Sequence, residues 1–79
     1  MREAKVMLNS VELVKEFNAI CMNYNCDIDV SSSNKRCPVD GKSLLGLFAL
    51  DRSKLVTVSV NGEPEEENKF LAEIKKFEV

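Results

Sequence analysis

The chain contains no histidine among its 79 residues. Histidine is the side chain most often used for proton transfer near neutral pH and the commonest metal ligand, so its absence excludes imidazole catalysis and histidine-bound metals. The cysteines, Cys21, Cys26 and Cys37, form no C-x-x-C pair, and a four-ligand zinc site would need a carboxylate at an unusual spacing. We therefore expect no metal and no cofactor, and we interpret the cysteines as buried free thiols in a reducing compartment.

Long apolar runs and clusters of positive charge are also missing. No segment approaches the roughly 20 apolar residues of a membrane span, and the N-terminus lacks the apolar core of a signal peptide. The net charge is −2, the isoelectric point is about 5.1, and no Lys/Arg run exceeds two residues. The composition therefore predicts a cytoplasmic protein with no membrane or nucleic-acid partner.

The length predicts a single domain spanning residues 1–79. Hydrophobic residues make up 44% of the chain and charged residues 30%, the balance of an ordinary globular protein rather than of a disordered one. We expect the domain to fold alone.

Alternation of polar and apolar residues predicts strands at residues 5–9, 26–31, 36–39 and 55–60. Because Pro38 has no N–H to donate, the third of these strands should lie at a sheet edge. The side chains expected to face the core are Val6, Leu8, Cys26, Ile28, Val30, Cys37, Val39, Val56, Val58 and Val60. Asp27, Asp29, Thr57 and Ser59 should face the other way.

Apolar residues at intervals of three and four predict a helix over about residues 10–23, with Leu13, Val14, Phe17, Ile20, Cys21 and Tyr24 on its apolar side. Asn9 and Ser10 are both good N-cap residues, and Asn9 and Glu12 have the spacing of a capping box. A last helix should begin at Pro64, with Glu65, Glu66 and Glu67 in a solvated first turn. Its buried side chains should be Phe70, Leu71, Ile74 and Phe77.

The polar break at residues 40–43 is followed by a short apolar run that predicts another helix, with Ser43 at or next to its N-cap. Five apolar side chains of this run spread over more than half of the helix circumference, wider than one core-facing stripe needs. Part of this surface should protrude, and we interpret it as a site for partner docking. Its candidate residues are Leu44, Leu45, Leu47 and Phe48.

The resulting order, β-α-β-β-α-β-α, predicts an α+β fold in which helices cover one face of a sheet of about four strands. Residues 39–50, VDGKSLLGLFAL, resemble the regulatory-serine segment and short second helix of the HPr phosphocarrier family of the bacterial sugar phosphotransferase system. Residues 61–63 and the acidic start of the last helix also match in order and spacing. The resemblance implies an open-faced β-sandwich with a four-stranded antiparallel sheet and three helices on one side.

The chain departs from that family at the loop before the first helix. Phosphate-carrying members place a histidine there, with an arginine and a proline close behind it, whereas here Asn9 and Ser10 run directly into Val11. The Ser10 hydroxyl has no adjacent base to activate it, and the cysteines are expected late in a helix or facing inward. The family's active-site segment is missing.

Ser43 occupies the position of the serine that a dedicated kinase phosphorylates in this family. A phosphate at a helix N-cap is stabilised by the helix dipole and by free N–H groups, and it would place negative charge beside Leu44 and Phe48. Serine is also a preferred cap where no kinase acts. Both interpretations of Ser43 stay open at this point.

The main hypothesis is a non-catalytic HPr-like regulatory or docking protein, similar to catabolite-repression paralogues that also lack the histidine. The resemblance implies protein partners such as a phosphotransferase-system component, an HPr kinase or a transcription regulator, and a second copy of the chain could also pair with the apolar patch. One alternative is a phosphocarrier that uses Ser10 or a thiol as the nucleophile. Another is a ferredoxin-like small-molecule-binding module, because that fold shares the order β-α-β-β-α-β.

Overall fold

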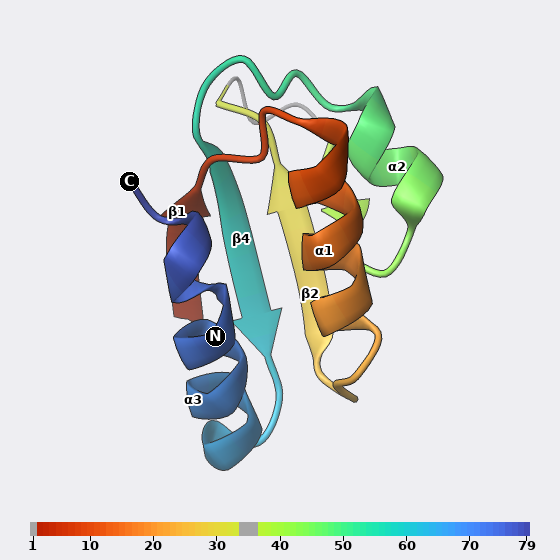
Figure 1. Ribbon diagram of the computed structural model, residues 1–79. Coiled ribbons are helices and arrows are strands. Elements are labelled where there is room, and N and C mark those ends of the chain that lie inside the picture. The colour runs from red at the N-terminus through yellow and green to blue at the C-terminus, as the bar shows by residue number, and fades with distance from the viewer. Residues whose placement is uncertain (1, 34–36) are drawn as a thin grey trace.

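The structure is a computed structural model that describes residues 2–33 and 37–79 (Figure 1). The predicted order of elements is confirmed. The strands are β1 (Arg2–Val6), β2 (Asp27–Ser31), β3 (Val39–Asp40) and β4 (Val56–Asn61). The helices are α1 (Val11–Cys21), α2 (Leu44–Ala49) and α3 (Pro64–Glu73), and α3 runs on into the short 3₁₀ helix η1 (Ile74–Phe77).

The four strands form one antiparallel sheet in the order β1-β4-β2-β3. The strand with the most β-branched residues, β4, pairs with both β1 and β2 and therefore lies inside the sheet. Val58 lies opposite Ala4 on one side and Val30 on the other. This placement suits β-branched side chains, which pack well against cross-strand neighbours.

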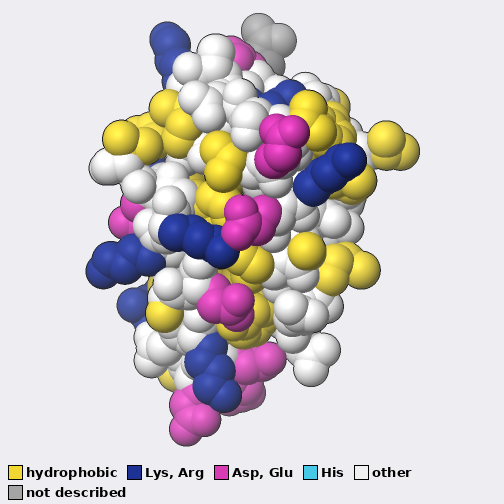
Figure 2. Space-filling view, viewed as in Figure 1, with side chains coloured by type: hydrophobic (Ala, Val, Ile, Leu, Met, Phe, Trp, Pro, Cys, Tyr) yellow, Lys and Arg dark blue, Asp and Glu magenta, His cyan; other side chains and the backbone are white. Residues whose placement is uncertain are grey.

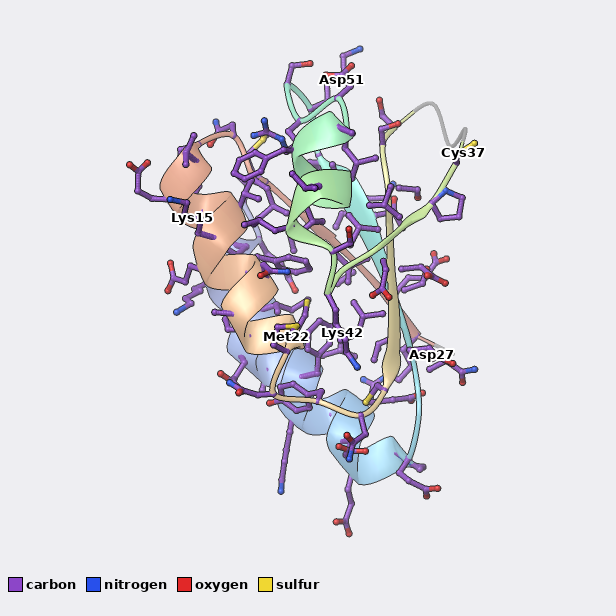
Figure 3. All side chains as sticks on the ribbon, turned by 90° about the vertical axis from the view of Figure 1, so that its right-hand side faces the viewer. Lys15, Met22, Asp27, Cys37, Lys42 and Asp51 are labelled. Atoms are coloured by element: carbon purple, nitrogen blue, oxygen red, sulfur yellow. The ribbon has the colours of Figure 1, made fainter. Side chains whose placement is uncertain are left out.

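The helices cover one face of the sheet, as the α+β prediction requires. In Figure 1, α1 and α3 lie in front of the strands, and the side view of Figure 3 shows the helices on one side of the sheet. Phe17 of α1 contacts Phe70 and Phe77 edge-on, with ring centroids 6.3 Å and 5.8 Å away, so the two helical segments meet over the sheet. The buried core consists of Val6, Leu8, Val14, Phe17, Ile20, Cys21, Cys26, Ile28, Val30, Leu47, Val56, Val58, Val60, Phe70, Ile74 and Phe77. No helix in residues 2–33 and 37–79 is long and apolar enough to cross a membrane.

The first strand ends earlier than predicted. It spans Arg2–Val6 rather than residues 5–9, because its partner β4 starts at Val56, directly opposite Val6. Beyond Val6 the chain turns toward the C-terminus, where the Met7 N–H donates to the Phe77 carbonyl at 2.9 Å. Leu8 is still fully buried as predicted, although it lies outside the strand.

The third strand is shorter than predicted and lies at the sheet edge as expected. Only Val39 and Asp40 pair, with Val30 and Asp29 of β2. The prediction that Cys37 faces the core is wrong, because Cys37 precedes the paired residues and its side chain is exposed (Figure 3). Arg36, the first residue of the expected strand, lies outside the described residues.

Helix α1 is capped by Ser10, whose Oγ accepts a hydrogen bond from the Leu13 N–H at 3.2 Å. Asn9 is therefore not the cap, and the capping box expected from Asn9 and Glu12 is wrong. The helix ends at Cys21, two residues before the predicted end, and the chain then turns through Met22 and Asn23.

Helix α3 begins with Pro64 as predicted and carries three glutamates in its first turn. The expectation that all three are solvated is wrong for Glu67, which is only 6% exposed. Its carboxylate accepts a hydrogen bond from the Gly62 N–H at 2.9 Å and so closes the turn between β4 and α3. A Cβ at Gly62 would lie 2.9 Å from the Cys26 sulfur, so this turn has no room for a side chain.

Candidate functional site

The N-terminus of α2 is built around Ser43. Its exposed side chain caps the helix, with Oγ accepting a hydrogen bond from the Gly46 N–H at 3.2 Å. The preceding turn is held by Asp40, whose side chain accepts from the Lys42 N–H and whose carbonyl accepts from the Ser43 N–H, both at 2.9 Å. The predicted role of Ser43 as a cap is confirmed.

Gly46 allows this helix start to pack closely. A Cβ at Gly46 would lie 3.1 Å from both the Val39 Cβ and the Ser43 Oγ, tighter than ordinary side-chain contacts. The absence of a side chain there lets α2 rest on β3 while the Ser43 hydroxyl reaches back to the helix. The position of the hydroxyl therefore depends on the glycine three residues later.

The apolar surface of α2 does protrude, as predicted. Leu45 is 84% exposed, and Leu44 and Phe48 are partly buried against the core. The expectation that Leu47 belongs to the docking surface is wrong, because its side chain points into the core and is fully buried. We call Leu44, Leu45 and Phe48 the α2 patch. Figure 2 shows apolar side chains along the right-hand edge of the molecule, where Figure 1 draws α2.

The segment that joins β1 to α1 is short, and its side chains are partly used by the core and by the helix cap. Leu8 is buried, and the Ser10 hydroxyl oxygen is engaged by the Leu13 N–H at the start of the helix. Val11, the first helical residue, is 50% exposed. Nothing in the geometry of this segment supplies a base beside the Ser10 hydroxyl to activate it as a nucleophile.

Comparison with protein families identifies the chain. A family model described as "PTS HPr component phosphorylation site" matches residues 11–78. The chain belongs to the HPr family of the phosphotransferase system. The match starts at the first residue of α1, so the segment between β1 and α1 lies before it.

The structural comparison agrees with this HPr assignment. The fold is similar to that of HPr-C-His from Thermoanaerobacter tengcongensis, with a TM-score of 0.72 and 20% sequence identity over 96% of this chain and 92% of that one. At this identity the likeness shows the fold alone, which is HPr-like rather than ferredoxin-like. No curated protein sequence matches the chain.

Arg52 is a residue of this HPr chain that the sequence analysis did not single out. Its Nη1 donates a hydrogen bond to the Leu8 carbonyl at 3.1 Å, and its Cζ lies 5.4 Å from the centre of the Phe48 ring. It thereby connects the segment before α1 to the α2 patch. The four-residue spacing between Phe48 and Arg52 was the available sequence signal, because it suits contact between a ring and a cation near a helix end.

The cysteines divide into two groups. Cys21 and Cys26 are buried, and burial, with a smaller contribution from Asp40, raises the pKa of the Cys21 thiol to about 12. Burial also raises the pKa of Cys26. Neither forms a thiolate readily near neutral pH, which makes both poor nucleophiles. Within residues 2–33 and 37–79, no group of three Cys, Asp or Glu side chains could hold a metal ion.

Proposed function

We propose that this member of the HPr family is a non-catalytic docking and regulatory module that binds protein partners through the α2 patch. The observation that carries the proposal is the exposure of Leu45, at 84%, beside the partly exposed Leu44 and Phe48. A contiguous apolar surface of this kind is characteristic of a protein-binding site. The partners that suit the family are a phosphotransferase-system component, an HPr kinase or a transcription regulator.

The chemistry of the chain supports docking over phosphate transfer. A phosphocarrier needs a nucleophile that ionises near neutral pH or has a neighbouring base, and the chain has no histidine. The Ser10 oxygen caps α1, and the thiols of Cys21 and Cys26 are buried with raised pKa values. The exposed Cys37 precedes β3 and does not stand at a helix N-terminus, the setting that activates a thiol. The module therefore acts by binding rather than by carrying phosphate.

Phosphorylation of Ser43 regulates docking in this proposal. The Ser43 side chain is exposed at the N-terminus of α2, adjacent to Leu44 and five residues before Phe48. A phosphate there adds about −1.5 to −2 charges and accepts hydrogen bonds from free N–H groups of the first helical turn. The added charge opposes desolvation of the α2 patch and so weakens apolar docking.

Docking is tested with a purified general phosphotransferase enzyme, HPr kinase and an HPr-dependent transcription regulator, using calorimetry. Leu45→Glu should abolish binding, because Leu45 contributes the most exposed part of the α2 patch without being part of the core. Val79→Glu is the matched control, since Val79 is also an aliphatic side chain, 98% exposed, at the opposite side of the molecule from α2 (Figure 1). Equal binding by Leu45→Glu and the original chain would exclude the α2 patch as the docking site.

The regulatory part is tested by incubating the protein with ATP and an HPr kinase, followed by mass spectrometry of the peptides. We expect a single phosphate on Ser43, and none on the Ser43→Ala variant. The phosphorylated protein should then bind its partner more weakly than the unmodified one. If Ser43 stays unmodified, regulation by phosphorylation is excluded, and only the docking part of the proposal is left.

The competing carrier hypothesis is tested separately with labelled phosphoenolpyruvate and the general phosphotransferase enzyme. We expect no label on the protein. If the original chain is labelled and the Cys37→Ser or Ser10→Ala variant is not, the protein is instead a carrier with a substitute nucleophile.

A further inference from the structure

A pocket of about 460 Å³ lies at the end of the sheet where β1 stops and β4 starts. Its lining comes from three parts of the chain: the end of β1 with Lys5 and Met7, Ser33 shortly after β2, and the start of β4 with Ser53, Lys54, Leu55 and Thr57. Figure 1 shows these segments meeting at the upper end of the sheet. The volume falls within the range typical of small-molecule sites.

The pocket belongs to the face of the sheet that the helices leave open. Thr57 of β4 lies directly opposite Lys5 of β1 on one side and Ser31 of β2 on the other. Val56 and Val58 are buried in the core, so the side chain of Thr57 points to the opposite face. The expectation that Thr57 lies on the face away from the helices is therefore confirmed, and its side chain is only 8% exposed there. It forms the covered base of the pocket.

The lining combines positive charge, hydroxyl groups and apolar surface. Two lysines, Lys5 and Lys54, line the pocket, and none of its described lining residues carries a carboxylate, in a chain whose net charge is −2. Met7 and Leu55 supply apolar contact area. Such a pocket, apolar with a few convergent polar groups, matches the usual composition of a ligand site.

The carboxylate of Asp51, two residues before the lining residue Ser53, is already engaged by its own loop. The Asp51 carboxylate accepts hydrogen bonds from the Ser53 hydroxyl at 2.7 Å and the Ser53 N–H at 3.1 Å, and these bonds lower the pKa of Asp51. The Ser53 hydroxyl proton is therefore directed away from the pocket. The groups that remain to donate hydrogen bonds to a ligand are the two lysines and the hydroxyls of Ser33 and Thr57.

We propose that this pocket binds a small organic anion, whose phosphate or carboxylate pairs with Lys5 and Lys54 and whose apolar part lies against Met7 and Leu55. Charge-assisted hydrogen bonds fix the anionic group, and burial of the apolar part adds affinity. The site shares no residue with the α2 patch. The inference therefore goes beyond the proposed docking function and does not depend on it.

The test is a titration of the ¹⁵N-labelled protein with phenyl phosphate, followed by amide chemical shifts. We expect saturable shifts at residues 5–7 and 53–57. The double variant Lys5→Gln/Lys54→Gln should weaken binding by about fivefold or more, because it removes both charge-assisted contacts. Both lysines are exposed, so the fold should be retained, and Lys69→Gln on α3 is the control that should bind as tightly as the original chain.

Three results would overturn the proposal. The first is the absence of saturable shifts in the two segments. The second is weakening by Lys69→Gln that is as large, per charge removed, as that by the double variant, which would indicate attraction by net charge alone. The third comes from two partial ligands. If inorganic phosphate binds as tightly as phenyl phosphate, the apolar side chains of Met7 and Leu55 play no part. If benzyl alcohol binds as tightly, the lysines play no part. None of these results bears on the Leu45→Glu assay, which tests docking on its own.

Discussion

The guanidinium of Arg52 lies over the ring of Phe48, with its Cζ 5.4 Å from the ring centre, while Nη1 donates to the Leu8 carbonyl at 3.1 Å. One side chain thus ties the segment before α1 to the α2 patch. The Nε atom of Arg52 is buried and has no hydrogen-bond partner among the described residues, which offsets part of this stabilisation.

Replacing Arg52 should destabilise the fold measurably. Arg52→Ala removes the cation–π contact and the hydrogen bond to Leu8, and we expect a loss of about 1–2 kcal/mol in the free energy of unfolding. Urea denaturation measures this, with Lys54→Ala as the control, expected to stay within about 0.5 kcal/mol of the original chain. Equal stability of the two variants would show that the Arg52 contacts contribute no net stabilisation.

The two candidate caps of α1 can be told apart by substitution. Ser10→Ala leaves the Leu13 N–H without its side-chain partner and should cost about 1 kcal/mol of stability. Asn9→Ala should change stability by less than about 0.5 kcal/mol, because Asn9 is exposed and precedes the cap. Thermal unfolding followed by circular dichroism would reveal the difference, and the reverse order would restore the Asn9 capping box.

Glu67 should contribute more to stability than the exposed Glu65 in the first turn of α3. Glu67→Ala leaves the Gly62 N–H unpaired in a confined turn, and we expect a loss of about 1–3 kcal/mol. Glu65→Ala removes only an exposed charge near the helix N-terminus and should cost about 0.3–1 kcal/mol. Denaturant unfolding of the two variants provides the comparison, and similar losses would contradict the role of Glu67.

The cysteines should differ sharply in reactivity. With a disulfide-exchange reagent at pH 8, we expect Cys37 to react rapidly, because it is exposed, and Cys21 and Cys26 to react only on unfolding, because both are buried. Mass spectrometry of the labelled peptides assigns each thiol, and Cys37→Ser should remove the fast phase. A fast phase that survives in Cys37→Ser would show that a second thiol is accessible.

Stability should fall at alkaline pH. In the folded protein, burial raises the pKa of Cys21 from 9.0 to about 12, and burial with a hydrogen bond to Glu73 raises that of Tyr24 from 10.0 to about 12. Between these values the unfolded chain loses protons that the folded protein retains, so the unfolded state gains stability as pH rises. Chemical denaturation from pH 8 to 11 should show this slope, and Cys21→Ala should reduce it. A slope identical in the variant would contradict the buried, neutral thiol.

The sequence predicted the parts of the molecule that depend on local pattern. The alternation of Val56, Val58 and Val60 identified the central strand, and Ser43 and Pro64 marked the starts of α2 and α3, because side-chain periodicity and capping are properties of neighbouring residues. The apolar excess of α2 was visible for the same reason, and the family resemblance followed from residues 39–50.

Tertiary structure decided the rest, because pairing and burial depend on residues distant in the chain. The first strand stopped at Val6 where β4 had no further residue to pair, and Leu47 turned inward while Leu45 stayed exposed. Arg52 donates a hydrogen bond to the carbonyl of Leu8, which lies 44 positions earlier in the sequence. The pocket at Lys5 and Lys54 likewise exists only because β1 and the start of β4 are neighbours in the sheet, and no local pattern contains that information.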